Sequence, residues 1–81
     1  METLDRVAAL TEIWRQVLGN PGLDETSDIF ESGGTSLHVL RITGQIYDTL
    51  GVDVPLRQVF TYPTPRGLSA FLDEQRATPG D

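Results

Sequence analysis

The sequence predicts an all-α fold: a small four-helix bundle of three main helices and a short third helix, with a long ordered loop after the first. Apolar residues recur at three- and four-residue steps over long stretches, as one face of an amphipathic helix requires. Glycine and proline stand where these stretches end. Pro55 directly follows the one short alternating segment, Val52 to Val54, which is therefore expected to be an extended connection and not a strand.

Length and composition limit what the chain can do. Its 81 residues, 38% of them apolar, allow one small domain, which we expect to span residues 1–76 and to be followed by a short polar tail over 77–81. The chain has no cysteine and one histidine, so disulfides, thiolate zinc sites and histidine-rich metal sites are excluded and no metal is expected.

Charge and hydropathy narrow the class of partner. The formal net charge of −6 opposes binding to nucleic acid or to an anionic membrane, because both require clustered Lys and Arg. The sequence has no apolar stretch near 20 residues and no signal-peptide pattern, so a soluble cytoplasmic protein is expected.

The first helix is predicted from Thr3 to about Leu18, with Thr3 as its cap and Trp14 in the core. The loop that follows, 23–35, contains four acids and no base. Within it Asp28 and Glu31 have the spacing of a capping box around one helical turn, which would direct Ile29 and Phe30 inward. The loop is therefore expected to be ordered.

A second helix is predicted over 36–50, ending at Gly51. Its apolar residues form two adjoining stripes: the first contains Val39, Ile42, Ile46 and Leu50, and the second contains Leu37, Leu40 and Tyr47, with Tyr47 expected at the edge of the core. Gly44 in the middle of this helix costs about 1 kcal/mol relative to Ala, which predicts close packing against another helix. The remaining residues predict a short helix around Val59 and a last helix that Thr64 caps and Pro65 begins.

The segment 33–37 places the hydroxyl of Ser36 at the start of a helix, behind two glycines. One interpretation is an ordinary N-cap, for which Thr35 would serve equally well. A hydrolase nucleophile is disfavoured, because His38 replaces the second glycine of G-x-S-x-G and lies badly for a base acting on Ser36. A third interpretation is that another protein modifies Ser36, since the glycines leave access and helix-terminal N–H groups accommodate a phosphate.

A wider pattern favours the third interpretation. The run Gly33-Gly34-Thr35-Ser36-Leu37 resembles the phosphopantetheine attachment motif of the peptidyl carrier proteins, or thiolation domains, of nonribosomal peptide synthesis, within the acyl carrier protein superfamily. The similarity covers about residues 4–75. It includes three further segments: Asp28-Ile29-Phe30 before the motif, the exit from the second helix over 50–56, and Val59-Phe60 with Pro63-Thr64.

The resemblance implies a non-catalytic carrier in which Ser36 receives the 4′-phosphopantetheine arm of coenzyme A from a phosphopantetheinyl transferase. Gly33, Gly34, Thr35 and Leu37 would form the attachment loop around that serine. The thiol of the arm would hold an aminoacyl or peptidyl group as a thioester in natural-product biosynthesis, such as that of antibiotics. The implied partners are an adenylating enzyme and condensation, tailoring or thioesterase enzymes, with no nucleic acid or membrane, and the chain is expected to be a monomer.

Two features distinguish this chain within the pattern. Thr35 stands where the family usually has Asp or His, which leaves partner choice open although the serine and both glycines are intact. The predicted second helix carries no net charge, unlike the acidic helix of fatty acid carriers, so partner recognition is expected to rest on apolar contact. The candidate surface comprises Leu37, Leu40, Arg41 and Phe60, with Val39 a further candidate. Core positions are the alternative for all four apolar residues, and this alternative is favoured more for Val39 and Leu40 than for Leu37. His38 is expected to be exposed and to have no function.

Two other functions stay open: a carrier of a polyketide or fatty acyl intermediate, and a helical interaction module without a prosthetic group. Met1 lies directly before the first predicted helix and the tail ends within ten residues of Leu72, which favours a free-standing carrier. The identity of the cargo is not encoded in these residues.

Overall fold

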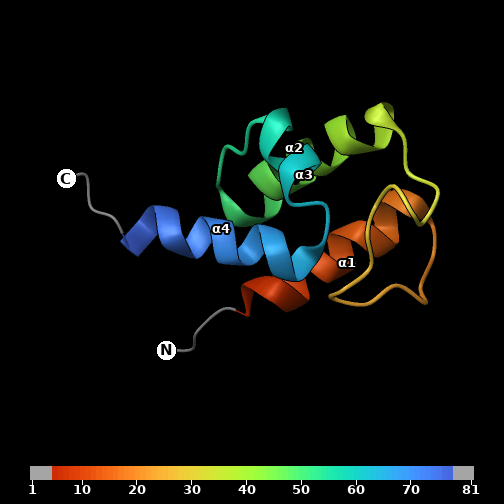
Figure 1. Cartoon of the computed structure of the whole chain (residues 1–81), viewed down its shortest axis with the longest axis horizontal. Helices are drawn as coiled ribbons and strands as arrows, with labels where there is room; N and C mark the ends of the chain where they lie inside the picture. The colour runs from red at the N-terminus through yellow and green to blue at the C-terminus, as the bar shows by residue number, and fades with distance from the viewer. Residues whose placement is uncertain (1–4, 78–81) are drawn as a thin grey trace.

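The computed structural model describes residues 5–77, with side chains through residue 74. Within that range the chain forms four α-helices and no strand, which confirms the predicted all-α class (Figure 1). The helices are α1 (Arg6–Leu18), α2 (Ser36–Leu50), α3 (Leu56–Thr61) and α4 (Pro65–Ala77). The helix α1 packs against α2 and α4, and the short α3 packs against α2. None of the helices in this part of the chain has the length and hydropathy needed to cross a membrane.

The start of α1 differs from the prediction. Asp5 is the N-cap: its backbone is extended, and its side chain accepts a hydrogen bond from the Ala8 N–H at 3.2 Å. The predicted cap, Thr3, lies outside the described residues, as does the tail over 78–81. Aspartate is as good a cap as threonine and lies nearer to the first buried turn, which explains why the helix begins at Arg6. Gly19, in the left-handed conformation with φ 65°, ends the helix as expected.

A single apolar core joins the four helices. Trp14 is fully buried, as predicted, and the first stripe of α2 faces inward through Val39, Ile42 and Ile46. The other buried apolar residues are Leu10, Ile13, Leu23, Ile29, Val54, Val59, Leu68 and Leu72. Val39 is therefore a core residue, and Leu40, at 54% exposure, is not.

Two predictions for α2 are wrong. Gly44 is exposed, and a Cβ placed on it would meet no other atom within 4 Å, so close packing against another helix does not explain this glycine. Tyr47, expected at the edge of the core, is 60% exposed. Both positions lie on the side of α2 that the other helices leave exposed, and the short α3 of six residues, which packs against α2, does not cover them.

The long loop between α1 and α2 is joined by hydrogen bonds and an ion pair to the segment that begins α4. The carbonyl of Pro63 accepts two hydrogen bonds, from the Trp14 indole Nε1–H at 3.1 Å and from the Ile29 N–H at 3.0 Å. The Arg66 N–H donates to the Glu25 carbonyl at 2.9 Å, and the two side chains form an ion pair. These contacts hold the loop beside α1 and α4, so the entry to α2 has a defined place in the fold.

The joint between α3 and α4 matches the prediction. Thr64 caps α4 through its hydroxyl, which accepts from the Gly67 N–H at 3.0 Å, and Pro65 is the first helical residue. Proline suits this position because its missing N–H would have no partner there.

Candidate functional site

One turn of chain, residues 28–34, leads into α2 and begins the candidate site. The Asp28 carboxylate accepts from the N–H groups of Phe30 at 2.7 Å and Glu31 at 3.1 Å, so Asp28 caps this turn as expected. Ile29 is fully buried below it. Phe30 does not point inward as predicted: it is partly exposed and stacks on Phe60, with the ring centroids 5.4 Å apart. The turn has one inward position, and Ile29 occupies it.

The two glycines of the site have different roles. Gly33 has φ 94°, a conformation that glycine adopts without strain, and the space beside it is open. Gly34 donates to the Ile29 carbonyl at 2.7 Å, and a Cβ on Gly34 would lie 2.6 Å from that same oxygen. Gly33 therefore shapes the turn, and Gly34 allows the backbone to close onto Ile29.

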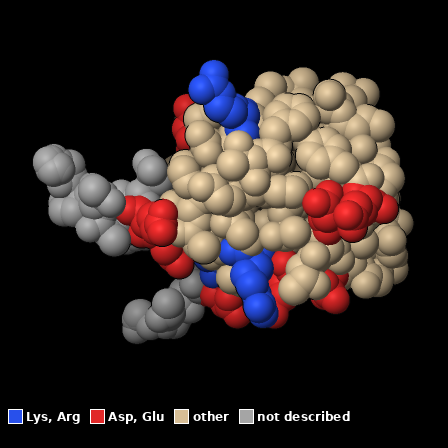
Figure 2. Space-filling view, in the orientation of Figure 1, with Lys and Arg blue, Asp and Glu red and all other residues tan. Residues whose placement is uncertain are grey.

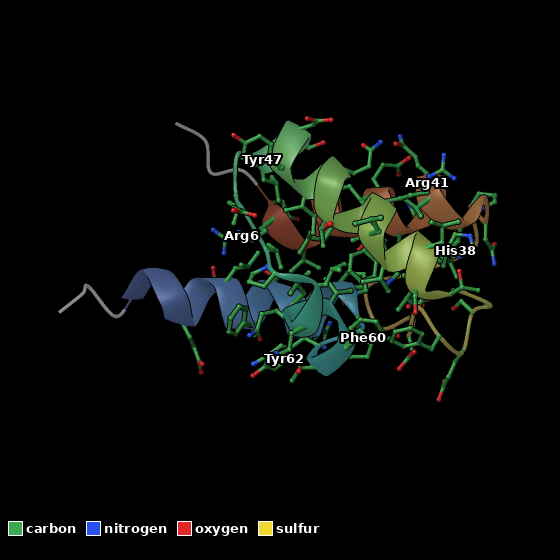
Figure 3. The ribbon with its side chains drawn as sticks, turned by 90° about the horizontal axis from the view of Figure 1, so that it is seen from above. Arg6, His38, Arg41, Tyr47, Phe60 and Tyr62 are labelled. Atoms are coloured by element: carbon green, nitrogen blue, oxygen red, sulfur yellow. The ribbon has the colours of Figure 1, made fainter. Side chains whose placement is uncertain are left out.

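Ser36 is the first residue of α2 and is exposed, while Thr35 is the N-cap. The interpretation of Ser36 as an ordinary N-cap is therefore wrong. Thr35 forms a capping box with His38: the Thr35 N–H donates to Nδ1 of His38 at 3.0 Å, and the Thr35 hydroxyl lies 3.1 Å from the same nitrogen. In Figure 3, His38 lies at the end of α2 that carries the site.

The capping role of His38 was missed in the sequence. Counted from Ser36, the third following residue is Val39, and the usual second member of a capping box is Glu or Gln, so this rule does not indicate His38. The spacing from Thr35 to His38 is the signal that finds it. His38 is half-buried and hydrogen-bonded, so it is not the simple exposed residue that the sequence suggested.

Exposed apolar side chains surround Ser36. Leu37 is 67% exposed and Leu40 54%, and Phe60 of α3 presents a partly exposed ring beside Phe30. Arg41 is exposed on the same helix. Leu37, Leu40 and Phe60 belong to the set of large hydrophobic side chains that are exposed in the described part of the chain, together with Phe30, Tyr47 and Leu56. Figure 2 shows a broad uncharged area over α2 and α3, with acidic side chains over the neighbouring loop.

The acids of the loop include one with a perturbed pKa. The Asp24 carboxylate accepts from the Thr26 hydroxyl at 2.7 Å and from the Thr26 N–H at 2.9 Å. These bonds, with smaller contributions from Ser27 and from the charge of Arg15, hold the pKa of Asp24 below its usual value of 3.8. Asp24 thus acts mainly on local loop structure.

The fold and the site define a carrier domain: a small helical bundle that presents one exposed serine at a helix N-terminus, with access from solvent and an apolar surface beside it. Comparison with known proteins gives the family. Residues 8–72 match the family described as "Phosphopantetheine attachment site", and the chain belongs to that family. Its members carry phosphopantetheine covalently and act with partner enzymes, so the chain is a non-catalytic carrier of this prosthetic group.

Individual relatives and structures agree with this assignment. The chain is 39% identical over 67 residues, 83% of its length, to tyrocidine synthase 3 of Brevibacillus parabrevis, and spans 1% of that protein. It resembles a solved "Non Ribosomal PCP domain" with a TM-score of 0.73 and 28% identity, over 86% of this chain and 90% of that one.

It also resembles a chain in the structure of the phosphopantetheine transferase Sfp in complex with coenzyme A and a peptidyl carrier protein. The TM-score is 0.80 and the identity 29%, over 90% of this chain and 95% of that one. The expected class, a peptidyl carrier domain of the nonribosomal peptide synthetase type, is confirmed.

Proposed function

We propose that Ser36 is the residue that carries the phosphopantetheine arm. The observation that supports this most directly is its position, exposed and first in α2, where the N–H groups of the first turn have no partner within the helix. A phosphate joined to the Ser36 oxygen would lie against these groups and the positive end of the helix dipole. The space beside Gly33 is open and Ser36 is exposed, so the site fits a phosphodiester-linked arm that extends into solvent.

Attachment requires an external enzyme. The Ser36 oxygen attacks the phosphorus of coenzyme A that bears the pantetheine, a new O–P bond forms, and the bond from that phosphorus to the departing nucleotide breaks. Adenosine 3′,5′-bisphosphate leaves, and the serine proton passes to a base on the transferase, because an unassisted serine hydroxyl is a weak nucleophile. Gly33, Gly34, Thr35 and Leu37 form the attachment loop that the transferase approaches.

In this proposal the thiol of the arm holds an aminoacyl or peptidyl group as a thioester. An adenylating enzyme loads it, and condensation, tailoring or thioesterase enzymes receive it. The zero net charge of α2, where Arg41 offsets Asp48, favours this cargo class over a fatty acyl or polyketide intermediate, whose carriers resemble one another in an acidic second helix. Loading trials that compare amino-acid-activating enzymes with acyltransferases would separate the two classes.

Mass spectrometry tests the attachment site. The apo-protein is incubated with coenzyme A and a permissive transferase, and we expect the mass to rise by one phosphopantetheinyl group. The variant Ser36→Ala should gain nothing. Ser32→Ala, which removes a nearby hydroxyl from the same loop, should be modified like the wild type. Modification that persists in Ser36→Ala, or its absence from the wild type, would contradict the proposal.

A further inference from the structure

The backbone immediately before Ser36 is fixed at two consecutive residues. The Gly34 N–H is held by the Ile29 carbonyl at 2.7 Å, and the Thr35 N–H by Nδ1 of His38 at 3.0 Å. The first bond anchors the turn to the core through the buried Ile29. The second comes from a side chain of α2 itself, and it sets the angle at which the chain enters the helix.

We infer that His38 is a positioning residue for the attachment reaction. Its neutral ring accepts the Thr35 N–H and thereby holds the Ser36 hydroxyl where the transferase needs it. This inference rests on the proposed function of Ser36. His38 acts through Thr35 and not by contact with the reacting atoms.

The hydrogen bond from the Thr35 N–H determines which tautomer of the His38 ring is required. A nitrogen that accepts a hydrogen bond from a backbone N–H has a free lone pair, so in neutral His38 the ring proton resides on Nε2. His38 thus takes the part that Glu or Gln plays in the usual capping box, in which the third helical residue reaches back to the N-cap N–H.

Loss of the His38 acceptor would change the orientation of the Ser36 hydroxyl. Without it the Thr35 N–H turns to water, and the peptide units on either side of Thr35 lose a restraint on their torsions. Thr35 is exposed, so packing does not replace that restraint. Because phosphoryl transfer requires the attacking oxygen to lie in line with the leaving group, a spread in the position of Ser36 lowers the rate at saturation.

Two substitutions distinguish positioning from other roles. His38→Ala removes the acceptor, whereas His38→Gln keeps one at the length of a natural capping box. We expect His38→Ala to lower the kcat of attachment about 3- to 10-fold, the range of one hydrogen bond, and His38→Gln to stay within about twofold of wild type. Gln45→Ala, an exposed polar residue two turns along α2, is the matched control and should have no effect. Failure of glutamine to rescue the rate, or a change in KM alone, would overturn the inference.

A spectroscopic measurement on the apo-protein gives a second readout. Proton–nitrogen correlation spectra of the imidazole ring in mildly alkaline buffer should show the proton on Nε2, and the Thr35 amide should exchange faster in His38→Ala than in wild type. A ring protonated on Nδ1 would overturn the inference. If the proposed function fails, the wild type gains no mass, while the ring spectrum is unaffected; the two failures are therefore distinguishable.

Discussion

At the scale of single residues, the approach of Gly34 to Ile29 leaves no room for a side chain. A Cβ on residue 34 would lie 2.5 Å from the Ile29 side chain and 2.6 Å from its carbonyl oxygen, and the oxygen belongs to a backbone held by Pro63. We expect Gly34→Ala to destabilise the fold by about 1–3 kcal/mol, since the turn must move outward to accept the methyl group. Urea unfolding measures this directly.

Gly44 provides the matched control. It lies within α2 with open space around it, so Gly44→Ala should stabilise the fold by about 0.5–1 kcal/mol through lower backbone entropy in the unfolded chain. Equal effects of the two substitutions would contradict the roles assigned to these glycines.

At the scale of elements, capping residues and apolar periodicity predicted the helices, but they did not predict which side chains of one helix are buried by another. The caps at Thr64 and Gly51 and the inward stripe of α2 depend on neighbouring residues along the chain, and the sequence predicted all of them correctly. The exposure of Phe30 and Tyr47 depends on where α3 packs against α2, and the spacing of apolar residues in the sequence does not predict that position. The proposed attachment loop shows the same division: the motif in the sequence indicates its glycines and serine, whereas the contact of Gly34 with Ile29 is visible only in the fold.

The short length of α3 bears on the surface that partner enzymes would contact. Because α3 packs beside α2 over only six residues, it leaves Leu40 exposed one turn beyond Ser36, and we propose that Leu37, Leu40, Arg41 and Phe60 form the surface that partner enzymes contact. Leu40→Ala should slow loading by a partner enzyme about fivefold or more, the effect of removing a central interface side chain.

Tyr47→Ala is the control for Leu40→Ala. Tyr47 has a similar exposed fraction, 60% against 54%, and lies about 16 Å along the helix from Ser36. We expect its loading rate to remain within about twofold of wild type and both variants to keep their unfolding midpoints, because neither side chain is buried. Steady-state loading kinetics decide the matter: equal rates for the two variants would remove Leu40 from the partner surface.

At the scale of the whole molecule, the net charge of −6 is unevenly placed. Four of the acids lie in the loop that leads to Ser36, yet three of them have structural roles: Asp24 accepts from Thr26, Glu25 pairs with Arg66, and Asp28 caps the turn before the glycines. Substituting the acids that have structural roles would disturb the structure of the loop as well as its electrostatic field. Glu31 is exposed and belongs to the turn directly before the glycines, so it is the acid best placed to act on an approaching partner.

In the proposed attachment the transferase holds the phosphates of coenzyme A beside Ser36, so the cationic groups that bind these phosphates would face the loop before Ser36. We expect Glu31→Gln to lower the association rate constant with the transferase about two- to threefold at low salt, and this difference to vanish at high salt as the charges are screened. Asp48→Asn removes one acid about 18 Å further along α2, beyond the screening length at physiological salt, and should leave the rate unchanged. Stopped-flow association across a salt series would separate the two variants. If the association rates of the two variants respond alike, the electrostatic attraction depends on the total charge of the molecule and not on the loop before Ser36.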